Sequence, residues 1–371
     1  MKKIIVMCLV LLFLVFYGFA QETSTKEYKI STEKILKIDM KTGGLLNIEG
    51  WGKKVVKTTG DCDWKIEWNK DGDTIELEAR CRYRKSEASK MSRRLTVFVP
   101  RRFDLEIKSQ GGPIHIKNIE GTINGKTLGG ELKLHRLKGT AHLKTMGGAI
   151  TLTDSNLDGK LSTMGGRVLF ENVVGDVEGH SMGGSVVYKN VKRKKGTPNG
   201  QPIRMKTMGG AIIVNHAPNG AILHTMGGKV NIKSAAKFID AKTMGGDILV
   251  KELDGWIKAS TMGGKIDVTM VGDPSKGKRD VTLESKGGDI YLSVPANLSM
   301  DIEAQVIIKK GQSSKGRIVS DFPLKQKAPE TLESKVGKNR EIIGATGTVG
   351  GGKHKIRLKT WSGKIVIKKN K

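Results

Sequence analysis

Cysteine, proline and aromatic residues are scarce in this 371-residue chain, which has 3 Cys, 9 Pro and 5% Phe, Trp and Tyr. Three cysteines are too few for a disulfide-dense scaffold or a multi-cysteine zinc module. The 48 glycines follow no three-residue period, so collagen is excluded. Carboxylates are also few, because 37 Asp and Glu face 65 Lys and Arg, a formal net charge of +28. Short, regular runs of Val, Ile and Leu nevertheless indicate a folded chain rather than a disordered one.

The N-terminus has the pattern of a secretory signal peptide. Lys2 and Lys3 precede an apolar run over residues 4–16, and the small residues Gly18 and Ala20 follow. This pattern predicts cleavage before Gln21, so residues 1–20 are a signal peptide and the mature protein is secreted or lies in the cell envelope. An uncleaved anchor helix is the alternative, but the run is short for crossing a bilayer. No later segment is long and apolar enough to span a membrane.

Two cysteines remain in the exported chain, and they flank a predicted β-hairpin. Apolar and polar residues alternate over 62–68 and again over 75–81, with Asp71-Gly72 between the two runs. Asp-Gly is a preferred two-residue hairpin loop, and a loop there places Cys62 directly opposite Cys81. Opposed strand residues lie within the span of a disulfide. We therefore predict a structural Cys62–Cys81 disulfide, with two buried free thiols as the alternative.

An 18-residue repeat dominates the rest of the chain. Gly-Gly pairs begin at Gly111, Gly129, Gly147, Gly165, Gly183, Gly209, Gly227, Gly245, Gly263 and Gly287. The step is 18 residues except after Gly183, where it is 26, and after Gly263, where it is 24. Two and four residues after the second glycine, every copy has an apolar residue, as at Ile248 and Val250. Alternation with period two predicts a strand with one buried face.

Stacked copies of this short unit predict an all-β fold, a β-solenoid with one 18-residue rung per repeat. A β-propeller is the rival, but its blades need roughly 40 residues each. We expect one elongated domain in four parts: an N-terminal β cap with the 61–83 hairpin and the first rungs (21–100), regular repeats (101–310), a polar loop excursion (311–345) and a terminal rung (346–371). The Gly-Gly pairs are expected at corners that need positive φ and exclude a Cβ atom.

The chain resembles the bacterial DUF4097 putative adhesin family. The resemblance rests on Val99-Pro100, on Gln110-Gly111-Gly112, on the repeated Thr-x-Gly-Gly blocks and on the final segment 358–365. It covers nearly the whole mature chain and implies a secreted or envelope-facing β-solenoid. The family has no assigned catalytic residues, so the resemblance implies none here.

Seven of the Gly-Gly pairs follow a methionine. These are Met146, Met164, Met182, Met208, Met226, Met244 and Met262, and Leu128 holds the same slot in an earlier copy. Thioethers favour Cu(I), which makes a metal site one interpretation. A slot that is filled once per rung is more simply interpreted as core or corner packing, and we expect no metal site. The Thr or Ser before each methionine is expected to form a hydroxyl ladder.

Basic residues recur at a slot expected to face outward, three residues before each Gly-Gly pair. Its lysines are Lys126, Lys144, Lys206 and Lys242, and the insertion after Gly183 adds Lys192, Arg193, Lys194 and Lys195. Such a face suits an anionic polysaccharide or another envelope polyanion. The alternative interpretation is that the lysines only keep the rod soluble and protect its edges. Base-specific nucleic-acid binding is not expected, because exposed aromatics do not alternate with the lysines.

Four apolar residues also occupy a slot expected to face outward: Leu169, Val187, Ile213 and Leu249. Such a patch is typical of a covered surface. We expect the 311–345 excursion to lie over it, with a partner or a second copy of the chain as the alternative.

An enzymatic function finds little support in the sequence. Solenoids that cleave glycans need clustered carboxylates, and here the acidic residues are scattered over different repeat positions. We therefore expect no catalytic residues and no cofactor. The leading hypothesis is an adhesin-like binding or structural module of the envelope, and the alternatives are a glycan-acting lyase or hydrolase and a purely structural surface protein.

Overall fold

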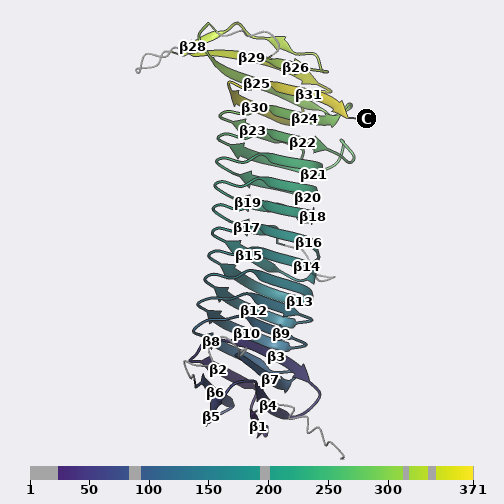
Figure 1. The fold of residues 1–371 in the computed structure, drawn as a ribbon. Coiled ribbons are helices and arrows are strands. Elements are labelled where there is room, and N and C mark those ends of the chain that lie inside the picture. Colours follow the sequence, from purple (N-terminus) through teal and green to yellow (C-terminus); the bar gives the residue numbers. More distant parts are fainter. Residues whose placement is uncertain (1–23, 83–92, 193–200, 312–316, 333–339, 371) are drawn as a thin grey trace, which may run out of the picture.

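The computed structural model describes residues 24–82, 93–192, 201–311, 317–332 and 340–370. Its strands stack as the rungs of one long rod, and the predicted all-β solenoid is confirmed (Figure 1). The predicted signal peptide lies outside the described residues. In the part of the chain that is described, no helix of a length and apolarity suited to crossing a membrane is present.

Each regular rung contributes one strand to each of two parallel sheets, and the described strands form a single hydrogen-bonded network. The first sheet contains β3 (Leu45–Trp51), β9 (Ile114–Lys117), β11 (Leu132–His135), β13 (Ile150–Thr163), β14 (Val168–Val174), β16 (Val186–Lys192), β18 (Ile212–Ala217), β20 (Val230–Lys242), β21 (Ile248–Thr261), β22 (Ile266–Met270), β24 (Ile290–Pro295) and β31 (Ile365–Asn370). The second contains β2 (Ile35–Met40), β8 (Asp104–Ser109), β10 (Glu120–Thr127), β12 (Lys138–Thr145), β15 (Val177–Ser181), β17 (Ile203–Lys206), β19 (Ala221–His224), β23 (Val281–Ser285), β30 (His354–Trp361) and β25 (Met300–Lys309). The long strands β13, β20 and β21 continue from the first sheet into the second.

The 18-residue sequence period is also the register of the sheets. Val230 pairs with Ile248 in the first sheet, and Ile239 pairs with Ile257 in the second. The residues two and four places after each Gly-Gly pair are at most 2% exposed in every copy, so the predicted apolar core is confirmed. The same pattern at the two ends buries Leu46 and Ile48 as well as Ile365 and Ile367. The first and last rungs therefore belong to the same core as the regular repeats.

The Gly-Gly corner is tight because consecutive rungs approach each other there. A Cβ atom on Gly246 would overlap the carbonyl oxygen of Gly228, one rung below. Of the second glycines in the regular pairs, however, only Gly112 and Gly130 have positive φ. The expected need for positive φ is thus wrong for most copies, whereas the exclusion of a Cβ atom is correct. Close approach of the backbone, rather than a left-handed conformation, requires glycine at this corner.

The left-handed residues lie at the opposite corner, between the two strands of a rung. Asn118, Arg136, Asp154, Asn172 and Asn190 all have φ between 50° and 61°, and they are spaced 18 residues apart. Asn and Asp adopt this conformation more readily than other residues with a side chain. Their side chains also join adjacent rungs, since the Asn172 amide donates to Asp154 at 3.1 Å and the Asn190 amide donates to Asn172 at 2.8 Å.

The Thr and Ser hydroxyls that form the expected ladder make hydrogen bonds with backbone groups rather than with the hydroxyls of neighbouring rungs. Thr225 Oγ1 donates to the carbonyl of Gly210 in the previous rung at 2.9 Å, and it accepts from the N–H of Gly228 at 3.2 Å. The same pair of bonds recurs at Thr145, Thr163, Ser181, Thr207, Thr243, Thr261 and Ser285. Each of these Thr and Ser residues is at most 5% exposed. The hydrogen bonds that stabilise the corner are therefore shielded from water.

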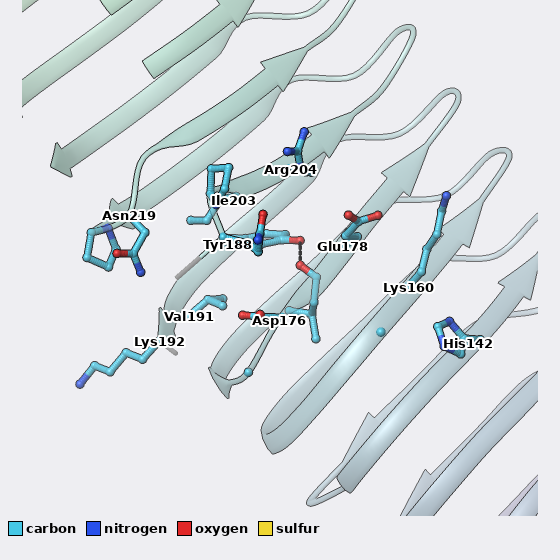
Figure 2. Close-up of a pocket in the computed structure, with 16 residues that line it drawn as sticks. His142, Lys160, Asp176, Glu178, Tyr188, Val191, Lys192, Ile203, Arg204 and Asn219 are labelled. Atoms are coloured by element: carbon cyan, nitrogen blue, oxygen red, sulfur yellow. Dashed lines mark hydrogen bonds between the residues drawn. The ribbon is translucent and has the colours of Figure 1, made fainter. Parts of the chain in front are cut away.

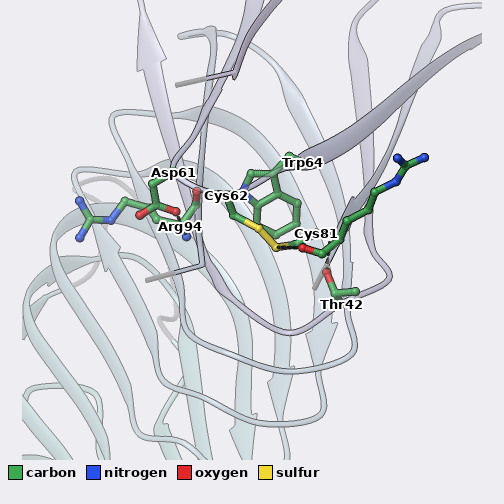
Figure 3. The surroundings of a disulfide bond; sticks show 7 residues. Thr42, Asp61, Cys62, Trp64, Cys81 and Arg94 are labelled. Carbon is green, nitrogen blue, oxygen red and sulfur yellow. Dashed lines mark hydrogen bonds between the residues drawn. A yellow bond between two sulfur atoms is a disulfide. The ribbon is translucent and has the colours of Figure 1, made fainter. Parts of the chain in front are cut away.

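Antiparallel strands close the N-terminal end of the rod. They are β1 (Ser24–Lys29), β4 (Val55–Gly60), β5 (Trp64–Asp71), β6 (Thr74–Cys81) and β7 (Arg94–Pro100), of which β6 and β7 join the parallel sheets directly. The hairpin register differs from the prediction: the loop is Gly72-Asp73, and Trp64 rather than Cys62 faces Cys81. The structure still joins Cys62 to Cys81 by a disulfide, with the Cα atoms 6.2 Å apart (Figure 3). Cys62 reaches its partner because the chain turns just before β5, where Trp64 N–H donates to Cys62 O.

The C-terminal end is closed by the segment expected to be a loop excursion. Its strands are β26 (Ile318–Ser320), β27 (Lys325–Gln326), β28 (Glu330–Leu332) and β29 (Arg340–Val349). Strand β29 pairs antiparallel with β25 along ten residues, and β27 and β28 add to its free edge. The expectation of a polar loop is wrong for this part, which forms a cap over the last rung (Figure 1).

The corner hydroxyls give a test of what holds the rungs together. Thr225→Val keeps the shape of the side chain and removes both hydrogen bonds, so we expect a loss of about 1–3 kcal/mol in the free energy of unfolding. Denaturant unfolding and amide hydrogen exchange of Gly228 measure the loss. Thr282→Val, on an exposed strand position, is the control and is expected to change stability little. An equal effect of the two substitutions would contradict the assignment.

Candidate functional site

The outer face of the second sheet carries a continuous column of polar side chains, here called the lysine column. From one end of the rod to the other it reads Asp39, Lys108, Lys126, Lys144, Ser162, His180, Lys206, His224, Lys242, Ser260, Glu284 and Lys359. The structure brings all four lysines of the predicted slot into this column, and all four are exposed. Neighbouring rungs are about 4.8 Å apart, so consecutive residues of the column follow one another at this spacing along the rod.

The four lysines of the predicted slot differ in their surroundings from lysines elsewhere on the rod. Among the described residues, no carboxylate forms an ion pair with Lys126, Lys144, Lys206 or Lys242. Several lysines elsewhere on the rod are paired, as in Lys117–Glu49 at 2.9 Å and Lys133–Glu131 at 2.6 Å. The lysine column therefore keeps its positive charge free for an external anion.

A second outward-facing column runs beside the first, two residues earlier on each strand. It contributes Lys160, Arg204 and Lys258, together with Glu178 and Asp240. These cations were not predicted from the sequence, although the period of two along a strand places them on the same face as the lysine slot. These residues carry three positive and two negative charges, so this column adds less net positive charge to the face than the lysine column, which has six lysines, Asp39 and Glu284.

Two imidazoles interrupt the lysine column. Burial, with Lys160 nearby, lowers the pKa of His180 below its usual value of 6.5. Burial likewise lowers the pKa of His224. Both side chains are therefore neutral at pH 7, and the column gains charge only in more acidic solution.

The eight-residue insertion opens the wall of the second sheet. A cavity of about 400 Å³ lies there, lined by Lys160, Asp176, Glu178, Lys192 and Arg204 among others (Figure 2). Of the predicted basic patch, Lys192 is exposed at the rim of this cavity, while Arg193, Lys194 and Lys195 lie outside the described residues.

The Tyr188 side chain forms hydrogen bonds at this opening that a neighbouring strand would form in a regular sheet. Its hydroxyl donates to Val177 O at 2.6 Å and accepts from Gly179 N–H at 2.9 Å. In a regular parallel ladder a single residue of the next strand would satisfy both groups, and by the register of Met205 with Gly179 that residue is Arg204. Burial raises the pKa of Tyr188, so the hydroxyl stays protonated and can fill both roles.

The predicted apolar column exists but is not covered as expected. Leu169, Val187, Ile213 and Leu249 pair in register along the first sheet, with Asn231 between the last two. Val187 is 3% exposed and the other three are half-buried. The described part of segment 311–345 caps the end of the rod instead of lying over these side chains, so the expected cover is wrong for the described residues of that segment.

The methionines that precede the Gly-Gly pairs are not in the core. Each of the seven is between 41% and 47% exposed, and Leu128 in the same column is 53% exposed. Of the two expected locations, core or corner, the core is therefore wrong, and the methionines lie in the Gly-Gly corners. The methionine lies two residues after the residue of the lysine column, in the Gly-Gly corner just beyond the end of the strand. A typical rung thus presents Arg204, Lys206 and Met208 in sequence to solvent.

Among the residues that the structure describes, no three His, Cys, Asp or Glu side chains come together as a group able to hold a metal ion.

The family model described as Toastrack DUF4097 matches residues 31–368. No curated protein matches the sequence. Among solved structures, the chain is similar to a "putative cell adhesion protein" from Clostridium sporogenes, with 13% identity, a TM-score of 0.21 and coverage of 94% of this chain and 100% of that chain. It is also similar to a "Putative lipid binding protein" from Parabacteroides distasonis, with 16% identity, a TM-score of 0.32 and coverage of 67% and 97%. A "putative adhesin" from Bacteroides fragilis gives 14% identity, a TM-score of 0.23 and coverage of 74% and 98%.

The two histidines predict a pH dependence of anion binding. Because burial lowers both pKa values, protonation begins only below pH 6.5 and adds positive charge to the lysine column. We expect the affinity for a polyanion to rise between pH 7.5 and pH 5, by up to about fivefold per histidine, since an exposed ion pair contributes at most about 1 kcal/mol. Binding isotherms across this range measure the rise.

The double variant His180→Gln, His224→Gln separates this effect from the protonation of carboxylates. It retains whatever rise the carboxylates cause and loses the part due to the imidazoles. Identical pH profiles for the variant and the natural chain would show that the histidines do not contribute.

Proposed function

The chain belongs to the Toastrack DUF4097 family, and we propose that it is a non-enzymatic binding protein of the cell surface or envelope that holds an anionic polymer along its lysine column. The single observation that carries this proposal is the column itself, an array of exposed lysines at rung spacing without acidic partners among the described residues. A polymer with repeating negative charges can contact several rungs at once. Each contact is weak, but contacts along one polymer add up in the manner of multivalent binding.

The geometry of the rod favours a long ligand over a small one. The lysine column follows the rod axis, and the lysines at residues 108, 126 and 144 occupy three consecutive rungs. Lys206 and Lys242 continue the column beyond the insertion, with His224 between them. A linear polyanion that lies along the axis therefore meets basic groups over most of the length of the second sheet. We infer an acidic polysaccharide as the ligand class, in keeping with a surface location.

A glycan-cleaving enzyme is the less favoured function. Cleavage of a glycosidic bond requires two carboxyl groups that flank the bond. In the adjacent column, Glu178 and Asp240 stand in different rungs and are separated by Arg204 and Ile222. This arrangement supports binding rather than catalysis.

The test compares two quadruple variants with the same change in charge. In the first, Lys126, Lys144, Lys206 and Lys242 are replaced by Gln. In the second, four exposed lysines of the first sheet, Lys133, Lys189, Lys233 and Lys251, are replaced by Gln. Binding to an acidic polysaccharide, a neutral polysaccharide and DNA is measured across a salt titration.

We expect the first variant to lose at least tenfold in affinity for the acidic polysaccharide. Its affinity should also depend less steeply on salt, because binding through fewer lysines releases fewer counterions from the polymer. The second variant is expected to bind nearly as well as the natural chain. Equal losses in both variants, or equal affinity for every polyanion that vanishes at modest salt, would mean that only net charge matters and would overturn the proposal.

A further inference from the structure

Exposed apolar side chains are concentrated in one column of the rod. In the described part of the chain, nine large apolar residues are exposed, and eight of them are Leu128 and the seven methionines that follow it in the same slot. Four other methionines, Met40, Met205, Met270 and Met300, are buried. Packing explains a buried methionine, but it does not explain why seven successive rungs present one to solvent.

The backbone joins five of these methionines, from Met182 to Met262, directly to one another, whereas Met182 N–H itself donates to Thr163 O at 3.2 Å. The N–H of Met208 donates to the carbonyl of Met182 at 3.0 Å, and Met226 donates to Met208 at 3.0 Å. The bonds continue from Met244 to Met226 at 2.9 Å and from Met262 to Met244 at 3.0 Å. The outward-facing thioethers of adjacent rungs therefore leave the backbone at the inter-strand spacing of about 4.8 Å.

Comparison among the repeats of this chain shows that methionine itself is retained. The core columns exchange Ile, Leu, Val, Phe and Tyr from rung to rung. The outward positions around the slot vary more widely, as Lys144, Ser162 and His180 show on one side and Arg167, Ala211 and Asp247 on the other. An apolar contact would be served equally well by Leu or Ile. The retained property is therefore the thioether.

We propose that the methionine ladder, Met146, Met164, Met182, Met208, Met226, Met244 and Met262, binds the soft monovalent cations Cu(I) and Ag(I) between thioethers of adjacent rungs. Thioether sulfur selects Cu(I) over harder metal ions. With a metal–sulfur bond of about 2.3 Å, the two sulfurs of a linear site lie about 4.6 Å apart. The rung spacing supplies this separation, and the flexible methionine side chain provides the remaining adjustment.

The charges beside the ladder permit a monovalent ion. Two residues before the methionine, only three of the seven rungs have a lysine, at Lys144, Lys206 and Lys242. Met164 and Met182 instead stand beside Ser162 and His180. Repulsion from exposed lysines is screened over about 8 Å at physiological salt. Of the adjacent pairs, Met164 and Met182 therefore meet the least repulsion from this slot, and the imidazoles of His180 and His224 add nitrogen ligands that suit copper.

The test is an anaerobic titration of the chain with Cu(I), in competition with a chromophoric Cu(I) chelator. Seven thioethers taken in adjacent pairs hold about three ions per chain. A parallel titration with Ag(I) follows the methyl signals of labelled methionines by NMR. We expect the signals of the exposed methionines to shift and those of the buried Met205 and Met300 to remain in place.

Variants that keep the surface apolar make the test specific for sulfur. Replacing Met182, Met208, Met226 and Met244 by Leu leaves one adjacent pair, so uptake should fall about threefold while circular dichroism shows an unchanged fold. Leu128→Met extends the ladder to eight thioethers and should add one further ion. Met300→Leu, in the core, is the control and should leave uptake unchanged.

Uptake by the leucine variant equal to that of the natural chain would overturn the proposal. Ag(I) shifts confined to histidine signals would do the same. Both results are independent of polyanion binding, because none of these substitutions alters a lysine.

Discussion

The close approach of consecutive rungs at the Gly-Gly corner is the constraint on which the rest of the rod depends. The corner hydroxyl, at Thr225 for example, ties the carbonyl of one rung to the N–H of the next, and the second glycine leaves no room for a Cβ atom. This contact fixes the vertical register, so that residues 18 apart in the sequence lie directly above one another. Every column on the surface, whether basic, apolar or thioether, follows from that register.

Repetition converts modest single features into extended surfaces. A lone lysine or methionine on a strand has little significance, but the same residue in successive rungs forms a line along the rod at about 4.8 Å per step. The lysine column lies on the second sheet, and the methionine ladder runs beside it along the Gly-Gly corners, two residues later in each rung. A linear ligand and a row of small ions are thus different uses of the same periodic scaffold, and they engage different side chains.

Irregular features are confined to places where the repeat is interrupted. The eight-residue insertion displaces one strand, and the Tyr188 hydroxyl takes over the backbone bonds that this strand would have made. The 24-residue step is stabilised by Arg279, a buried side chain that binds Asp254 at 2.6 Å and the carbonyl of Val271 at 2.7 Å. The two ends need antiparallel caps, because an open rung would expose a row of unpaired backbone groups.

The sequence by itself determined the solenoid, its period and its core. Burial of one face of a strand imposes an alternation of apolar and polar residues, which is directly visible in the sequence. It also placed Lys126, Lys144, Lys206 and Lys242 in a single repeat position. Only the tertiary structure decided which repeat positions face water: the slot of Met208 looked like core by its composition, yet the corner turns it outward. The hairpin loop lies one residue later than the sequence predicted, and this shift changes which residues face each other across the hairpin. The cover expected over Leu169 and Ile213 depended on where the described part of segment 311–345 folds. Such features are set by contacts between distant residues, which local periodicity does not encode.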